Sequence, residues 1–268
     1  MSVGRVCSWA FLGFGAVISH AEGAAWTAPK GRSYQRLAIE QFDTDIRFGE
    51  APGFERFRDT SISYYAEYGI IDDLTATLNT VVRNVAVQNA GAVARNSGLG
   101  DAELGLRYNF IGEPVVLSAQ ITFKAPYFYN SANQVPLGNG QEDVEARLLL
   151  GRNFGRFGYA NLEAAYRFRA GDPADEARYL AEYGADVSRS VYARVKLDVT
   201  QALGATRPTP DRFGNPDFPL SFDLGRVEAT LGWRLNKKVA LESSATFRVF
   251  GDNALGGIAY QAAIVLTL

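Results

Sequence analysis

The feature that most constrains the fold is a strict two-residue alternation across residues 225–250, GRVEATLGWRLNKKVALESSATFRVF. One face of its first half carries only apolar side chains, namely Val227, Ala229, Leu231, Trp233 and Leu235. The interleaved positions are Arg226, Glu228, Thr230, Gly232 and Arg234. After the polar residues 236–238 the alternation resumes, with Ser243 the only polar member of the apolar series from 239 to 249. A period of two predicts β-strands, and a short polar turn between two of them predicts an antiparallel hairpin.

The same hairpin recurs along the chain. Short turns are predicted at residues 69–73, 111–114, 153–157, 188–190 and 236–238, and longer loops at 85–97, 125–140, 170–176 and 203–220. They delimit about twelve strands of roughly ten residues, of which the first, at 33–48, alternates least regularly. The predicted fold is therefore all-β, a single antiparallel transmembrane β-barrel. The rival is a soluble sandwich or lipocalin-like barrel, whose strands are usually shorter and whose outer face is polar.

Aromatic side chains lie where a membrane barrel carries its two aromatic girdles. Near the short turns they are Tyr68, Tyr108, Phe110 and Trp233. Near the longer loops they are Phe123, Tyr127, Phe168, Tyr179, Phe247 and Phe250. The only long apolar run is at the start of the chain, which excludes a bundle of membrane-spanning helices of about 20 apolar residues each.

The start of the chain has the pattern of a secretory signal. Arg5 supplies a positive charge, residues 6–18 an apolar segment, and Ser19-His20-Ala21 the small residues of a cleavage site. Cleavage is predicted after Ala21, with Ala25 as the alternative site and an uncleaved membrane anchor as the competing interpretation. The predicted organisation is a signal peptide at 1–21, an irregular periplasmic lead-in at 22–32 and the barrel at 33–268.

Composition excludes several kinds of chemistry. The single cysteine, Cys7, and the single histidine, His20, both fall in the predicted signal, so the mature chain has no disulfide, thiolate metal site or Ser-His mechanism. A net charge of -2 argues against a nucleic-acid partner. Asp101 and Glu103 share one face, but a hydrated, arginine-rich surrounding favours ionised, paired carboxylates over acid-base catalysis. We predict no enzyme activity, no cofactor and no metal; the acidic loop 172–176 lacks the ligand spacing of a calcium loop.

The polar face of the strands would line the barrel interior. Its predicted basic residues are Arg83, Arg107, Lys124, Arg147, Arg167, Arg178, Arg194, Lys196, Arg226, Arg234 and Arg248. Its predicted acidic residues are Glu67, Asp101, Glu103, Glu145, Glu163, Glu182, Asp186, Asp198, Glu228 and Glu242. Either these charges line a narrow hydrated path for a polar solute, or they pair across the interior and close it. The hairpin pattern predicts Arg234 beside Glu242, and Glu228 diagonal to Arg248.

Two short motifs resemble a known family. WTAPKG at 26–31, and YAEYGI at 65–70 followed by DDL at 72–74, are similar to XagA-like outer-membrane proteins. These belong with the transporter-like barrels that include the phenol-degradation-pathway outer-membrane proteins. The resemblance implies exopolysaccharide export or biofilm formation, or uptake of small hydrophobic or polar compounds, and it supplies no catalytic residues. The chain departs from most such barrels by ending in Leu268 rather than Phe.

The sequence thus predicts a passive channel or export component for small solutes in the outer membrane of a Gram-negative cell, with both termini periplasmic. The alternative is a closed structural or adhesion barrel that binds partners through the loops at 125–140 and 203–220. A soluble periplasmic β protein is the third possibility. Expected partners are outer-membrane lipid, the barrel-assembly machinery and an export complex.

Overall fold

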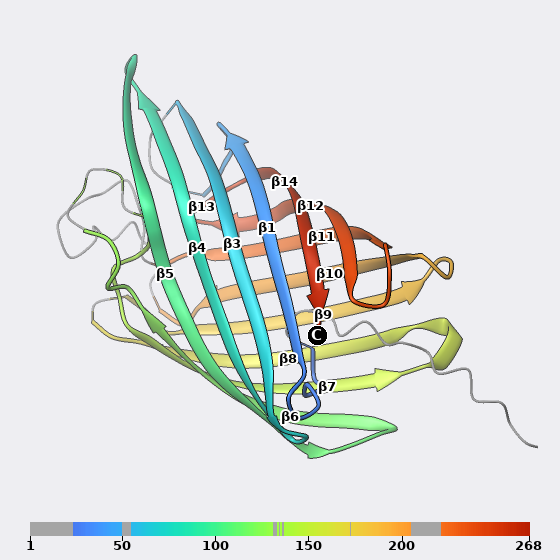
Figure 1. Cartoon of the computed structure of the whole chain (residues 1–268). Coiled ribbons are helices and arrows are strands. Elements are labelled where there is room, and N and C mark those ends of the chain that lie inside the picture. Colours follow the sequence, from blue (N-terminus) through green and yellow to red (C-terminus); the bar gives the residue numbers. More distant parts are fainter. Residues whose placement is uncertain are drawn as a thin grey trace, which may run out of the picture.

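Twelve antiparallel strands close into a barrel in a computed structural model of the chain (Figure 1). The structure describes residues 24–49, 55–130, 133, 135, 137–171, 173–204 and 221–268. The predicted signal peptide therefore lies outside the described residues, as does most of the 203–220 loop. Among the described residues, no helix is long and apolar enough to cross a membrane.

Each barrel strand pairs with its neighbours in sequence, and the first strand closes the ring against the last. The barrel strands are β1 (Ser33–Thr44), β3 (Arg56–Ile71), β4 (Leu74–Asn89), β5 (Ala92–Ile111), β6 (Val115–Ala125), β7 (Asp143–Asn153), β8 (Tyr159–Arg169), β9 (Glu176–Asp186), β10 (Val191–Ala202), β11 (Asp223–Arg234), β12 (Val239–Asp252) and β14 (Gly257–Thr267). Two short strands, β2 (Arg47–Phe48) and β13 (Ala254–Leu255), pair with each other outside the ring, and one 3-10 turn, η1 (Gly155–Phe157), joins β7 to β8. The predicted fold class is confirmed.

The connections differ between the two ends of the barrel. We call the end with the β3–β4, β5–β6, β7–β8, β9–β10 and β11–β12 connections the turn end, and the opposite end the loop end. The predicted loop at 85–97 is wrong, because β4 and β5 continue as one long hairpin that turns at Ala90 and Gly91, both with positive φ. Its alternation is weak in the sequence because the hairpin extends past the neighbouring strand β6, which pairs with β5 only from Ala102 onward.

The outer face of the wall is apolar. Leu104, Ile121 and Leu148 are 59%, 63% and 59% exposed although they lie in the middle of strands. The predicted girdle aromatics near the turns, Tyr68, Tyr108, Phe110 and Trp233, are also large exposed side chains. So are those near the loops, namely Phe123, Tyr127, Phe168, Tyr179, Phe247 and Phe250. A continuous apolar surface of this kind is unfavourable in water and is typical of a barrel surrounded by lipid.

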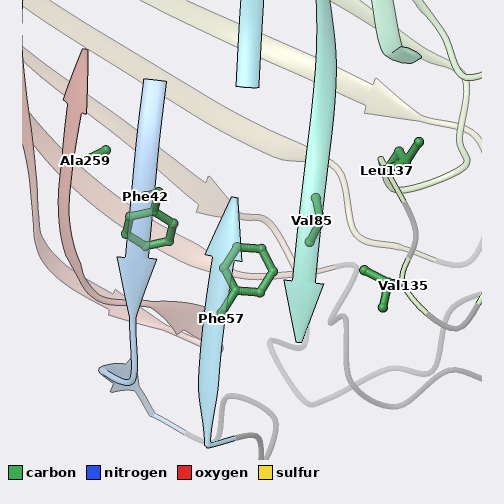
Figure 2. Close-up of a cluster of buried hydrophobic side chains, with 6 residues drawn as sticks. All are labelled: Phe42, Phe57, Val85, Val135, Leu137 and Ala259. Carbon is green, nitrogen blue, oxygen red and sulfur yellow. The ribbon is translucent and has the colours of Figure 1, made fainter. Parts of the chain in front are cut away.

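The inside of the barrel holds small apolar clusters near its ends. At the loop end, inward side chains of β1, β3, β4 and β14 pack with two residues of the β6–β7 connection, as Figure 2 shows: Phe42, Phe57, Val85, Val135, Leu137 and Ala259. At the turn end two clusters form, one of Tyr34, Tyr192, Ala240 and Val265 and one of Ala25, Val116 and Leu149. Charged side chains line the wall between the two ends.

Candidate functional site

The inner face of the wall is the candidate site. The side chains predicted to line the interior alternate with the exposed outer residues and lie on the inner face: Glu67, Arg83, Asp101, Glu103, Arg107, Lys124, Glu145, Arg147, Glu163, Arg167, Arg178, Glu182, Arg194, Lys196, Asp198, Arg226, Glu228, Arg234, Glu242 and Arg248. Asp186 belongs to the same series but is exposed at the turn-end rim of β9. Their part in conduction stays a prediction.

Glu145 is the centre of one charged group. Its carboxylate contacts guanidinium nitrogens of Arg147 at 2.5 Å, Arg167 at 2.9 Å and Arg178 at 3.0 Å. Arg147 also pairs with Glu163, and Arg167 reaches Glu103 on β5 at 3.2 Å. A small cavity, no larger than a water molecule needs, remains beside this group and is lined by Arg147, Glu163, Arg178, Tyr179, Leu180 and Asp198. The group narrows the middle of the interior without filling it.

Glu242 is the centre of a second group. It accepts hydrogen bonds from Arg36 at 2.8 Å and from the Tyr192 hydroxyl at 2.7 Å. Arg194, only 4% exposed, lies between three carboxylates: Glu228 at 3.6 Å, Glu242 at 3.7 Å and Glu182 at 3.8 Å. Removing one partner of a buried ion pair of this kind strongly destabilises the protein, because the other charge is left without compensation.

The residues that precede the first strand lie inside the turn end (dark blue in Figure 1). Ala25 is fully buried; its N–H donates to Asn161 at 3.0 Å and its carbonyl accepts from Ser118 at 2.5 Å. The Ala28 N–H donates to the Thr75 hydroxyl at 2.8 Å. We call residues 24–30 the inner segment. Cleavage after Ala21 keeps these Ala25 contacts, whereas cleavage after Ala25 removes them.

Two glycines of the wall make room for the inner segment. A Cβ atom at Gly69 would lie 2.1 Å from the Pro29 carbonyl oxygen. A Cβ atom at Gly151, on the inner face of β7, would lie 2.8 Å from the Trp26 ring. Since real Cβ atoms do not approach this closely, both positions require glycine when the inner segment lies inside the barrel.

Arg107 joins the wall to the inner segment. Its guanidinium is 1% exposed, pairs with Glu67 at 2.9 Å and donates to the Trp26 carbonyl at 3.0 Å. The Trp26 indole N–H donates to Glu113 at 3.1 Å, and its ring meets Tyr159 edge-on at 5.8 Å between centroids. The segment is thus held by side chains of the wall. Its one β-bridge is a parallel contact between Lys30 and Gly69.

Of the two placements predicted for the β11–β12 hairpin, Arg234 beside Glu242 is wrong, whereas Glu228 does lie diagonal to Arg248, because its register partner is Thr246. Arg234 has Ala240 as its register partner and pairs instead with Asp186 of the neighbouring hairpin at 2.6 Å. Glu228 pairs with Lys196 at 3.4 Å and Arg194 at 3.6 Å, both on β10. Each inner residue has a neighbour on both flanking strands, and a pattern within one hairpin cannot indicate which of them supplies the counterion.

Several interior residues were not predicted from the sequence. Arg36 and Glu40 lie in the irregular first strand, and others lie at strand ends: Asp59, Asp143, Arg169 and Glu176. Counting two residues onward or back from a predicted one finds three of them, Asp143, Arg169 and Glu176, but not Arg36, Glu40 or Asp59. The inner segment has no periodicity, so only the inward glycines hinted at it.

Asp101 and Glu103, the carboxylates weighed for catalysis, are both engaged. Asp101 accepts from the Tyr129 hydroxyl at 2.6 Å and lies 3.7 Å from Lys124, and Glu103 pairs with Arg167. Burial, and after it the Asp101 charge, raises the pKa of Tyr129, so this loop hydroxyl remains a donor. Within the described part of the chain, no group of three or more His, Cys, Asp or Glu is placed to hold a metal ion. Asp172 of the acidic loop lies outside the described residues.

Comparison with known proteins places the fold. No protein-family model matches the chain, and no curated protein matches it. Among solved structures, it is similar to the COG4313 outer membrane channel from Pseudomonas putida F1, with a TM-score of 0.74 and 14% identity over 93% of this chain and 100% of that one.

Two porins are also similar. The NanC porin has a TM-score of 0.57 and 7% identity over 87% of this chain and 100% of that one. The KdgM porin, solved in complex with disordered oligogalacturonate, has a TM-score of 0.53 and 6% identity over 88% and 99%. These likenesses agree with a transporter-like barrel and do not show the XagA-like resemblance. At such identities they establish that this chain has the fold of outer-membrane channel barrels.

Proposed function

We propose that this protein is an outer-membrane channel for small polar solutes, and that the inner segment blocks its turn end in the conformation described here. The observation that carries the proposal is the position of residues 24–30 inside the barrel, held mainly by side chains and joined to the strand ladder by a single β-bridge at Lys30. A segment attached in this way can leave without breaking the wall.

The two faces of the wall support a membrane location. The outer face presents exposed apolar and aromatic side chains, and the inner face presents ionised ones. Lipid around the barrel would contact the apolar outer face, and water inside the barrel would solvate the charged inner face. The turn end then faces the periplasm, because short turns lie on that side in barrels of this kind. The solved structures with this fold are described as outer-membrane channels and porins, which supports the proposal by analogy.

The interior favours small polar solutes over large or apolar ones. Twelve strands enclose much less space than the 16 to 18 of general porins, and the Glu145 and Glu242 groups narrow that space further. Both signs of charge line the passage, so the wall offers donors and acceptors alike. Exopolysaccharide export, which would need a wide path, is not part of the proposal.

The test is single-channel recording in planar lipid bilayers. We expect low or brief conductance from the purified full chain and at least a several-fold larger conductance from the same chain lacking residues 24–30. A matched control replaces Lys237 and Lys238, exposed in the β11–β12 turn at the same end, by glutamine and should leave conductance unchanged. Correct folding is checked by heat-dependent migration on gels.

A correctly folded deletion variant that does not conduct would contradict the channel. The ion-pair groups would then close the barrel by themselves, and a structural or adhesion barrel that binds partners through its loops would be the remaining function.

A further inference from the structure

Almost every charged side chain on the inner face of the described strands has an opposite charge within 4.0 Å, and two do not. They are Glu40 on β1 and Arg248 on β12. Within the described part of the chain, the one hydrogen bond that Glu40 accepts is from Gln261 at 3.4 Å, and the one that Arg248 donates is to the Leu255 carbonyl at 3.4 Å. In an interior where charges are otherwise compensated, these two groups are available to a ligand.

The two groups lie close to each other. The Arg248 guanidinium lies over the Phe42 ring, 3.8 Å from its centroid. It reaches that ring across β14, where Gly257 and Ala259 are small. Phe42 is the next inner residue after Glu40 on the same strand, and same-face neighbours are about 7 Å apart. Glu40 and the ring that carries the Arg248 guanidinium therefore occupy successive inner positions of β1.

A third charged group, the Asp59 carboxylate on β3, lies on the inner face beside Phe42. Asp59 is the register partner of Phe42 on β3 and is 7% exposed. It pairs with Arg83 through one carboxylate oxygen, while its Oδ1 atom is buried without a hydrogen-bond partner. On the basic side, Arg226 is the register partner of Arg248 but is already paired with Asp198 at 2.9 Å.

The four charged groups Glu40, Arg248, Asp59 and Arg83 have a net charge of zero. Arg248 and Glu40 cancel, as do Arg83 and Asp59. A lone anion or a lone cation would leave one of the open groups uncompensated, at the cost that an unpaired charge carries in a partly desolvated site. A solute with both a carboxylate and an ammonium group compensates both.

We propose that Arg248 and Glu40 form a binding site for a small zwitterion. Arg248 holds the carboxylate as a two-pronged donor, and Glu40, with the free Asp59 oxygen beside it, accepts hydrogen bonds from the ammonium group. The Phe42 ring keeps the guanidinium in place from behind. This inference rests on the proposed function, since the solute reaches the site through the interior, and it names the class of solute.

The test is equilibrium dialysis of the purified full chain in detergent with radiolabelled β-alanine, because dialysis to equilibrium does not depend on how slowly a solute enters. Propionate and propylammonium are the matched probes that lack one charge each. We expect both to bind at least about 10-fold more weakly than β-alanine, the effect of losing a hydrogen-bonded charge. Arg248→Gln and Glu40→Gln should each weaken β-alanine binding to a similar extent.

The control is Arg152→Gln. Arg152 lies over Phe154 at 5.4 Å but is exposed near the turn end, so its loss should leave binding unchanged. Each variant must show the heat-dependent gel migration of the folded barrel. Binding of propionate as tight as that of β-alanine, an unchanged affinity in folded Arg248→Gln, or no β-alanine binding to the folded chain would overturn the site.

Bilayer conductance of the same preparations separates this inference from the channel. Conductance without β-alanine binding would support the channel proposal and contradict the zwitterion site. Specific binding without conductance from the deletion variant keeps the site and counts against the channel.

Discussion

The two ends of the barrel interior hold different kinds of contact. At the turn end, main-chain groups of Ala25, Trp26 and Ala28 form hydrogen bonds with wall side chains. At the loop end, apolar side chains around Phe42 and Phe57 pack against one another (Figure 2). Water can replace the first kind of contact at a net cost of about 1 kcal/mol per bond, whereas exposing the second costs about 25 cal/mol per Å² of apolar surface. The comparison indicates that the contacts of the inner segment at the turn end break more easily than the apolar packing at the loop end.

The largest expected effect comes from Arg107, where the turn end depends on one side chain. Arg107→Ala removes a guanidinium that pairs with the buried Glu67 carboxylate, so we expect the free energy of unfolding to fall by about 3 to 5 kcal/mol. The same change releases the Trp26 carbonyl, so conductance should rise. Denaturant titration in detergent and bilayer recording measure the two effects.

Arg152→Ala is the matched control, because Arg152 is exposed near the same end and, among the residues that the structure describes, contacts the Phe154 ring and no carboxylate. Arg152→Ala should change neither the free energy of unfolding nor the conductance. Loss of stability in Arg107→Ala without a rise in conductance would mean that the inner segment stays in place without this hydrogen bond.

A smaller effect is expected at the loop end. Val85 is 1% exposed within the loop-end cluster, and Val85→Ala should lower the free energy of unfolding by about 2 kcal/mol. Conductance should stay low, because the inner segment still occupies the turn end. Val82→Ala on the same strand, with a side chain 49% exposed on the outer face, should have a much smaller effect on unfolding. A rise in conductance for Val85→Ala would reverse the comparison between the two ends.

The smallest effect is expected for Arg234, at the turn-end rim. Its partner Asp186 is exposed, and its guanidinium lies 4.7 Å from the centroid of the Tyr192 ring. Exposed ion pairs and such ring contacts contribute up to about 1 kcal/mol each, so Arg234→Ala should lower the unfolding free energy by less than about 2 kcal/mol and leave conductance unchanged. A loss as large as that of Arg107→Ala would show that Arg234 belongs to the buried network.

The sequence by itself determined the class of fold and the two faces of the wall. Alternation such as that of 225–235 is local, because successive side chains of any strand point to opposite faces. The apolar face is then assigned to the outer surface in contact with lipid, and the charged face to the hydrated interior. The even strand number and the short turns follow from the same rhythm, and the structure confirms them.

Only the tertiary structure decided how the inner charges are distributed and what fills the barrel. Counterions come from either flanking strand or from farther along the wall, as with Arg167 and Glu103, so the register of the whole ring is needed. The long β4–β5 hairpin extends past its neighbour β6 and loses the clear alternation. The inner segment is irregular and is placed by contacts with side chains of five strands, β4 to β8, including Thr75, Ser118 and Asn161. Long-range contacts of this kind leave no periodic signal in the chain, and they decide whether the barrel is open.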